Sequence, residues 1–294
     1  MKTKLNNINA SSLFHFTGQF DILQKIIRNG IRFSYAFEDL SYDVVNPVAP
    51  YLDDLGKSFE RLGVAIPMIS FCDIPIVRAS NHIDRYGEYM IGLDKSMIID
   101  MYNDIINPVI YMESNNLYLA FRDLASIPTE MFEEMLKKMM QTSKEDEDSR
   151  SKLINEEMPK YINRIFNVRF MMGLTKPVYN PIDNHCFYDE REWRAFWPDN
   201  HSDEKGWKWD ITREKHDKYK KEWNKELAHC DDGYMKLFPS MITHIVVKSE
   251  SQISKTTDLI LNSKTIFGDT NVSVDERLTL VSKVTSMERI ALDY

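Results

Sequence analysis

The apolar run AIPMISFCDIP, residues 65–75, is the feature that most constrains the fold. Pro67 and Pro75 bracket its apolar centre. A run of this length and composition predicts a buried β-strand, and the second proline predicts that the strand ends at a tight bend. We therefore expect a fold built around a sheet.

Strand and helix patterns alternate on both sides of this run. Before it, SLFHFTG at 12–18 alternates bulky with small or polar residues, and QFDILQKIIRNG repeats Ile and Leu at helical spacing up to Gly30. After it come a short helix in VRASNHIDRY and strands at EYMIGL, NPVIYM and CFYDEREWRAFWP. The order predicts an α+β protein.

The pattern changes at about residues 115–170, where Leu, Met and Phe recur at helical intervals around a charged loop. This stretch predicts a helical insertion between strands. Further on, EKHDKYKKEWNKEL predicts a solvated helix face or an exposed loop. The C-terminal region, about 240–294, predicts a strand at MITHIVVK, a helix at ESQISKTTDLILNS and a strand at ERLTLVSKVT. We expect a single α+β domain over residues 1–294 that carries this insertion.

Composition excludes several classes of function. The net charge of −8 argues against non-specific binding to a phosphate backbone. No stretch approaches the roughly 20 apolar residues of a membrane span, so we expect a cytoplasmic protein without a membrane partner. The three cysteines are widely spaced, which fits reduced thiols and indicates no metal site. Motifs of kinases, dehydrogenases, zinc proteases and serine hydrolases are missing from the sequence.

The segment FYDEREWRAF, residues 187–196, concentrates charge in a predicted strand. Strand alternation places Glu190, Glu192 and Arg194 on one face. Two carboxylates so placed repel unless a cation, a proton or a ligand lies between them. The segment fits a charged edge strand, a structural Glu–Arg pair, or an acid–base site in which one carboxylate has a raised pKa.

Four other residues invite a functional role, each with a structural alternative. His15 lies between two phenylalanines, as a core histidine or as a ligand contact. His82 could contact substrate or cap its helix. Cys72 lies in apolar surroundings that keep a thiol protonated, and Asp73 before Ile-Pro could anchor a turn.

Six stretches identify a family resemblance: FHFTG, GIRFSYAFED, AIPMISFCDIP, NHIDRYGEYMIGLDK, NPVIYM and DEREWRAF. In this order they closely resemble the bacterial AbiGi family, which is associated with abortive infection and phage resistance and is usually described as an antitoxin component. The resemblance spans most of residues 12–200. It implies an antiviral defence protein of a toxin–antitoxin system, with a cognate toxin or antitoxin protein as its partner.

A looser similarity concerns the order of a His strand, a Ser or Tyr strand and a Glu strand. This order is similar to that of ADP-ribosyltransferases, including the DNA-modifying DarT toxins and the poly(ADP-ribose) polymerases. It implies an ADP-ribosyltransferase-like mixed or antiparallel sheet core, with NAD as the substrate and a nucleic acid or a protein as the acceptor.

The same similarity implies roles for individual residues. For NAD binding it implies that His15 contacts a ribose, that Thr17 contacts a phosphate or ribose, and that Ser70 in SFCD stands in part for a Ser-Thr-Ser strand. Tyr86 or Tyr89 would be the aromatic platform, and Arg194 would bind a diphosphate oxygen or neutralise the carboxylates. Glu192 would be the catalytic acid, with Glu190 completing an ExE pair.

The leading hypothesis is therefore a phage-defence protein that transfers ADP-ribose from NAD to a macromolecule. Cleavage of the bond between nicotinamide and ribose builds positive charge on the ribose, which a carboxylate at Glu192 would stabilise. One alternative is a non-enzymatic antitoxin or sensor whose acidic surface binds and neutralises a basic toxin protein. Another is an NAD-binding module without transferase activity.

Overall fold

The computed structural model describes residues 10–39, 62–112, 173–179, 185–197 and 206–293, together with residues 137, 151, 152, 155 and 171. The chain divides into two compact units. The first, here named the sheet unit, comprises Met1–Leu40, Phe59–Val109 and Tyr188–Tyr294. The second comprises Ser41–Ser58 and Ile110–Phe187.

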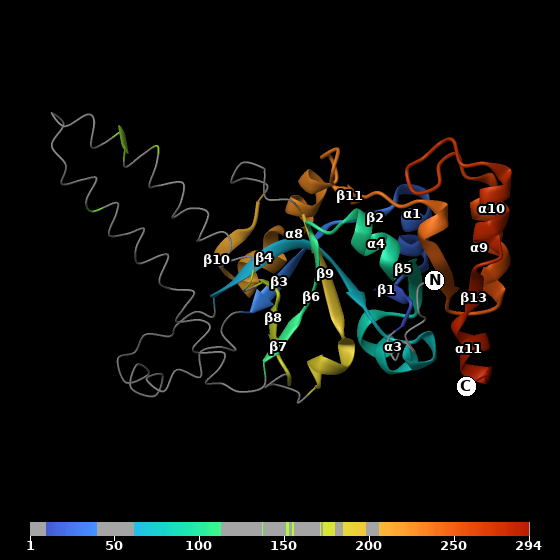
Figure 1. Cartoon of the computed structure of the whole chain (residues 1–294), viewed down its shortest axis with the longest axis horizontal. Helices are drawn as coiled ribbons and strands as arrows, with labels where there is room; N and C mark the ends of the chain where they lie inside the picture. The colour runs from blue at the N-terminus through green and yellow to red at the C-terminus, as the bar shows by residue number, and fades with distance from the viewer. Residues whose placement is uncertain are drawn as a thin grey trace, which may run out of the picture. The chain divides into compact units, whose positions relative to one another are not determined.

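The described strands and helices are interspersed along the chain (Figure 1). The strands are β1 (Ser12–Thr17), β2 (Ile31–Arg32), β3 (Ser34–Asp39), β4 (Leu62–Cys72), β5 (Tyr89–Asp94), β6 (Ile106–Pro108), β7 (Ile110–Met112), β8 (Thr175–Pro177), β9 (Glu192–Phe196), β10 (Lys208–Thr212), β11 (Tyr234–Met235), β12 (Ile242–Val247) and β13 (Val284–Ser286). The α-helices are α1 (Phe20–Asn29), α3 (Ser80–Tyr86), α4 (Lys95–Met101), α8 (Arg213–Leu227), α9 (Ser251–Asn262), α10 (Val274–Val281) and α11 (Met287–Asp293). The 3₁₀ helices are η2 (Ile76–Arg78), η4 (Phe187–Glu190) and η5 (Pro239–Met241).

The sheet unit is built on a nine-stranded sheet, counted over the described residues. Its order is β13-β12-β5-β1-β4-β9-β6, and β3 and β10 also pair with β4. Among these strands only β12 and β13 are parallel. The predicted α+β class with a mixed, mostly antiparallel sheet is confirmed.

The predicted buried strand at residues 65–72 is confirmed as part of β4, the strand with the most neighbours. Its first half lies between β3 and β10, and its second half pairs with β9 and, at Phe14 and Cys72, with β1. The carbonyl of Pro67 accepts a hydrogen bond from the backbone N–H of Trp197, just past the end of β9. The edge of Pro67 that lacks an N–H therefore faces the interval between β9 and β10, where no ladder donor is required.

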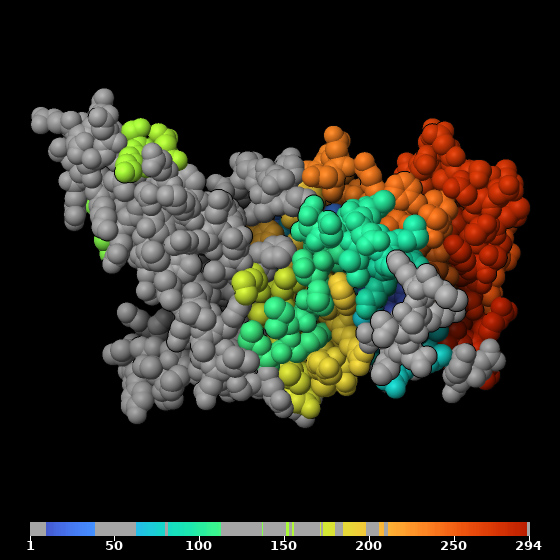
Figure 2. Space-filling model, viewed as in Figure 1, coloured from blue at the N-terminus to red at the C-terminus, as the bar shows by residue number. Residues whose placement is uncertain are grey.

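Two apolar layers cover the sheet. On one face, residues such as Leu13, Phe71 and Ile91 form the main core with buried side chains of α1, α4, α9 and α10. On the other face, Phe14 and Met90 form a smaller core with residues of α3 and α11. The C-terminal segment, orange to red in Figure 2, presents a continuous surface on the sheet unit.

The predicted glycine stop of the first helix is confirmed. Gly30 ends α1 with φ at +90°, and a Cβ at this position would lie 2.8 Å from the carbonyl oxygen of Met235. Glycine tolerates both constraints, because it has no Cβ and enters the positive-φ region at little cost. The helix buries Leu23, Ile26 and Ile27, which the helical spacing places on one side.

The prediction of a strand at residues 276–285 is wrong for most of that segment. Helix α10 covers Val274–Val281, and only the short β13 follows. The cause is a capping box in which Ser273 accepts from the backbone of Glu276 and the Glu276 carboxylate accepts from the backbone of Ser273. For residues 214–227, where a helix face or an exposed loop was expected, the structure has the helix α8, which buries His216 and Leu227.

The middle of the chain leaves part of the expected organisation as a prediction. The expected strand NPVIYM is two strands, β6 in the sheet unit and β7, which pairs with β8 in the second unit. The predicted insertion at about 115–170 lies almost wholly outside the described residues, so it stays a prediction, as does the single-domain organisation. Within the described part of the chain, no helix has the length and apolar character that a bilayer crossing requires.

Candidate functional site

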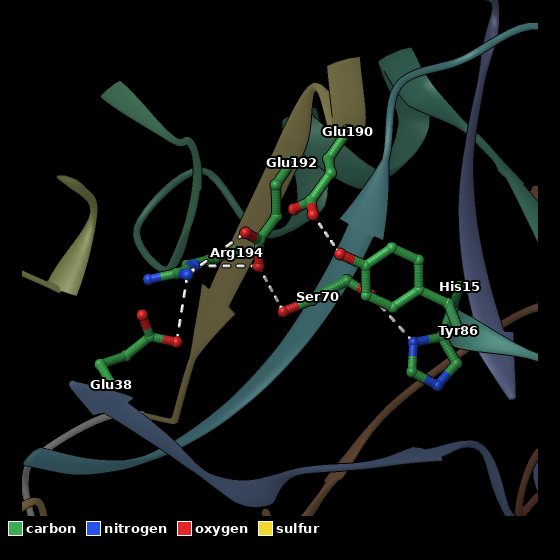
Figure 3. Close-up of polar contacts among 7 residues, drawn as sticks. All are labelled: His15, Glu38, Ser70, Tyr86, Glu190, Glu192 and Arg194. Atoms are coloured by element: carbon green, nitrogen blue, oxygen red, sulfur yellow. Dashed lines mark hydrogen bonds and ion pairs between the residues drawn. The ribbon is translucent and has the colours of Figure 1, made fainter. Parts of the chain in front are cut away.

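The candidate site lies in the sheet unit, on the face of β4 and β9 that carries their polar side chains. Glu192 begins β9 opposite Cys72 of β4, and the residue is 6% exposed. Ser70 of β4 donates its hydroxyl proton to Glu192 Oε1 at 2.7 Å (Figure 3). A hydroxyl on one strand thus fixes the carboxylate on the next.

Arg194, opposite Ser70 on the adjacent strand, contacts the same carboxylate. It is 1% exposed and donates from Nε to Glu192 Oε1 at 2.9 Å and from Nη2 to Oε2 at 3.2 Å. Its Nη2 also lies 3.1 Å from Oε1 of Glu38 on β3. Burial alone would lower the pKa of Arg194, but the carboxylates of Glu192 and Glu38 raise it above its usual value. Arg194 is therefore a permanent cation between two carboxylates.

The site places Glu190 differently from the sequence prediction. Glu190 ends the 3₁₀ helix η4, and Arg191, with φ at +44°, separates it from β9. The prediction that one strand face carries Glu190, Glu192 and Arg194 is right for the last two and wrong for Glu190. The left-handed backbone at Arg191 breaks the alternation on which that prediction depended.

Glu190 nevertheless reaches the same region through Tyr86. The Tyr86 hydroxyl at the end of α3 donates to the Glu190 carboxylate, which is buried (Figure 3). Burial, followed by the charges of Glu190 and Glu192, raises the pKa of Tyr86. Tyr86 therefore remains a protonated donor at neutral pH and couples α3 to the acidic residues.

His15 contacts Ser70 from the sheet face opposite to the Glu192 side chain. Strands β1 and β3 diverge along β4, since β3 ends its pairing at Met68 while β1 pairs at Cys72. In this opening the His15 Nδ1–H donates to the Ser70 carbonyl oxygen at 3.0 Å. Burial lowers the pKa of His15, and the hydrogen bond to Ser70 only partly offsets this effect. A neutral ring with Nδ1 protonated has an acceptor at Nε2.

Thr17 and Tyr89 lie apart from the carboxylates. They are opposite each other on β1 and β5, and they share the sheet face of His15 rather than that of Glu192. Tyr89 belongs to the main core, and its hydroxyl accepts from the side chain of Gln252. Of the two aromatic candidates, the structure therefore brings Tyr86 and not Tyr89 to the acidic residues.

The remaining sequence candidates have defined positions around the site. Cys72 is buried opposite Glu192. Asp73 anchors the end of β4, because its N–H donates to the Arg191 carbonyl and its carboxylate forms an ion pair with Lys95. His82 does not cap α3, whose N-cap residue is Ala79. Within the described ranges, no three His, Cys, Asp or Glu side chains are arranged to hold a metal ion.

Comparison with known proteins defines the family. The family model of the abortive phage resistance protein AbiGi, which its description terms an antitoxin, matches residues 54–248. The chain belongs to the AbiGi family. This range includes Ser70, Tyr86, Glu190, Glu192 and Arg194, whereas His15 precedes it.

A curated relative agrees with this assignment. The abortive phage resistance protein AbiGi of Lactococcus lactis subsp. cremoris is 26% identical over 242 residues, which cover 78% of this chain and 89% of the relative. No solved structure gives a significant match. The family resemblance predicted from the sequence is thus confirmed, and this AbiGi protein carries a polar cluster of Ser70, Glu192, Arg194 and Glu38, of which Glu192 and Arg194 are buried.

Proposed function

We propose that this AbiGi protein acts in phage defence by binding NAD at the Ser70–Glu192 site, on an ADP-ribosyltransferase-like fold, and transferring ADP-ribose to a macromolecule. The observation that carries the proposal is the position of Ser70. Its hydroxyl binds Glu192 and its carbonyl binds His15, so the three strands with the expected signature residues are adjacent in the sheet, as β1, β4 and β9.

The geometry supports defined roles in such a reaction. The Glu192 carboxylate, held by Ser70 and Arg194, would stabilise positive charge that develops on the ribose as nicotinamide leaves. Because these contacts already hold the carboxylate, little reorganisation is required. His15, whose side chain lies on the sheet face opposite Glu192, would act on this site by holding the Ser70 carbonyl through its Nδ1–H. Glu190, hydrogen-bonded to Tyr86, would accept the proton of the attacking nucleophile.

Label transfer from tagged NAD tests the proposal. Purified wild type, Glu192→Gln and the control Glu222→Gln, an exposed position on α8, are incubated with cell extract, DNA and RNA from cells before and after phage infection. We expect label on one class of macromolecule with wild type and Glu222→Gln, and none with Glu192→Gln. Absence of label with wild type under every condition would contradict transferase activity.

A second candidate function is that of an antitoxin that binds a partner toxin, and the description of the matching family favours it. The bidentate contact of Arg194 with Glu192 also suits a structural role for the pair. Expression in cells separates the two candidates. An active transferase slows growth when expressed alone and loses this effect with Glu192→Gln, whereas an antitoxin is harmless alone and restores growth to cells that express its toxin.

A further inference from the structure

His82 is a buried polar residue to which the roles above assign nothing. It lies on α3, one turn before Tyr86, and its side chain is 7% exposed. Among the described residues, no group forms a hydrogen bond with its Nδ1 atom. A buried nitrogen without a partner costs free energy that an apolar side chain would not cost. A buried atom of this kind calls for an explanation, and a contact made when a ligand binds is one.

The surroundings of His82 suit a planar ring. Its imidazole stacks with Phe16 at 6.2 Å and with Tyr86 at 6.3 Å between ring centroids, and Phe16 and Tyr86 are 6.4 Å apart. The three rings come from β1 and α3 and form a cluster, here named the aromatic cluster. Aromatic faces bind flat and cationic rings well, and a pyridinium is both.

The aromatic cluster adjoins the carboxylates of the candidate site. The Tyr86 hydroxyl donates to Glu190, and the charge of Glu192 also acts on Tyr86. A ligand ring beside Tyr86 would therefore lie close to both acidic residues. This is the position that the leaving group occupies if Glu192 acts on the ribose to which that group is attached.

We propose that His82 recognises the nicotinamide carboxamide of NAD, with Nδ1 accepting a hydrogen bond from the amide N–H while the ring packs in the aromatic cluster. This inference rests on the proposed function, because it assigns a specificity role within the same NAD site. His82 is distinct from Tyr86 in this role: Tyr86 supplies a ring face, whereas His82 supplies the polar contact that distinguishes a carboxamide from other substituents.

Calorimetric titration with NAD and with 3-acetylpyridine adenine dinucleotide, which has a methyl group in place of the amide NH₂, tests this role. We expect wild type to bind NAD about tenfold more tightly than the analogue, the effect of one hydrogen bond. The variant His82→Phe keeps an aromatic ring, so it should bind both dinucleotides equally and bind NAD about tenfold more weakly. The exposed control His229→Phe should behave as wild type.

The outcomes separate the failure of this inference from the failure of the proposed function. If wild type binds NAD but does not discriminate against the analogue, or if His82→Phe discriminates as wild type does, His82 has no recognition role and the NAD site stands. If wild type binds neither dinucleotide, the proposed function and this inference both fail. If His82→Phe does not fold, the comparison is made with His82→Leu, which also lacks the acceptor and should likewise bind both dinucleotides equally.

Discussion

Replacement of Arg194 by Met should destabilise the sheet unit strongly. Arg194 is 1% exposed and donates two hydrogen bonds to Glu192, which is 6% exposed, while Glu38 retains partial access to water. Removal of one partner of a buried ion pair costs about 3–5 kcal/mol, because the other charge remains buried without compensation. This corresponds to a fall in melting temperature of roughly 5–8 °C for a protein of this size.

Replacement of Glu192, the other residue of the buried pair, should have a smaller effect. Glu192→Gln keeps an acceptor for Arg194 and leaves Glu38 in place, so we expect a smaller loss of about 2 kcal/mol in the free energy of unfolding. In the double variant no charge is buried at position 192 when the cation is absent. The double variant should therefore cost less than Arg194→Met alone, which gives a coupling energy of at least about 2 kcal/mol.

The assay is urea unfolding followed by tryptophan fluorescence and circular dichroism for wild type, both single variants and the double variant. Arg289→Met is the control, since Arg289 pairs with Glu250 at the surface and its loss should cost less than about 1 kcal/mol. Additive effects of the two single variants, within about 0.5 kcal/mol, would refute the view that the buried pair is a coupled unit.

Three further variants test other contacts of the site. Because the pKa of Tyr86 is raised, the folded state keeps a proton that the unfolded state releases above about pH 10. The stability of wild type should therefore fall as pH rises past that value. The variant Tyr86→Phe should lose less stability over the same range, as measured by thermal melts at different pH. The lowered pKa of His15 has the opposite consequence, because the unfolded state gains a proton below about pH 6.5 that the folded state does not bind. Stability should therefore fall as pH decreases from that value. In the same melts, His15→Phe should show a weaker dependence of stability on pH. Ser70→Ala should cost about 1–2 kcal/mol of stability and, in the label-transfer assay, reduce transfer by at least about tenfold, because Glu192 loses its hydroxyl donor.

Local patterns predicted those parts of the fold that depend on local physics. The apolar run at 65–72 is β4 and the helical spacing before Gly30 is α1, because burial and backbone freedom leave direct traces in residue type. Helix α10 also has a local signal in the sequence, since Ser273 and Glu276 form the S-x-x-E signature of a helix start, although a strand was predicted there. The strand expected at residues 276–285 conflicts with this helix-start signature.

The site depends on register and on one backbone angle, which residue types do not reveal. Tyr86 and Tyr89 are equivalent candidates in the sequence, but the pairing of β1 with β5 puts Tyr89 into the main core. The positive φ of Arg191 separates Glu190 from β9. This conformation is uncommon for a residue other than glycine, so an arginine in the sequence does not predict it. Glu38 was missed because it meets Arg194 only when β3 and β9 both pair with β4, and the sequence does not reveal this pairing.

The contact of Arg194 with Glu192 bears differently on the two candidate functions. In a transferase, Arg194 keeps the carboxylate oriented, and the ribose must then approach a carboxylate that already contacts a cation. In an antitoxin, the same pair has a structural role. Together with Ser70 and Glu38 it forms a polar network, here called the joint, that links β3, β4 and β9. Both roles require the joint for stability, so a loss of activity in Arg194→Met would not separate them. Glu192→Gln does, because it removes the charge required for catalysis while it keeps an acceptor for the joint.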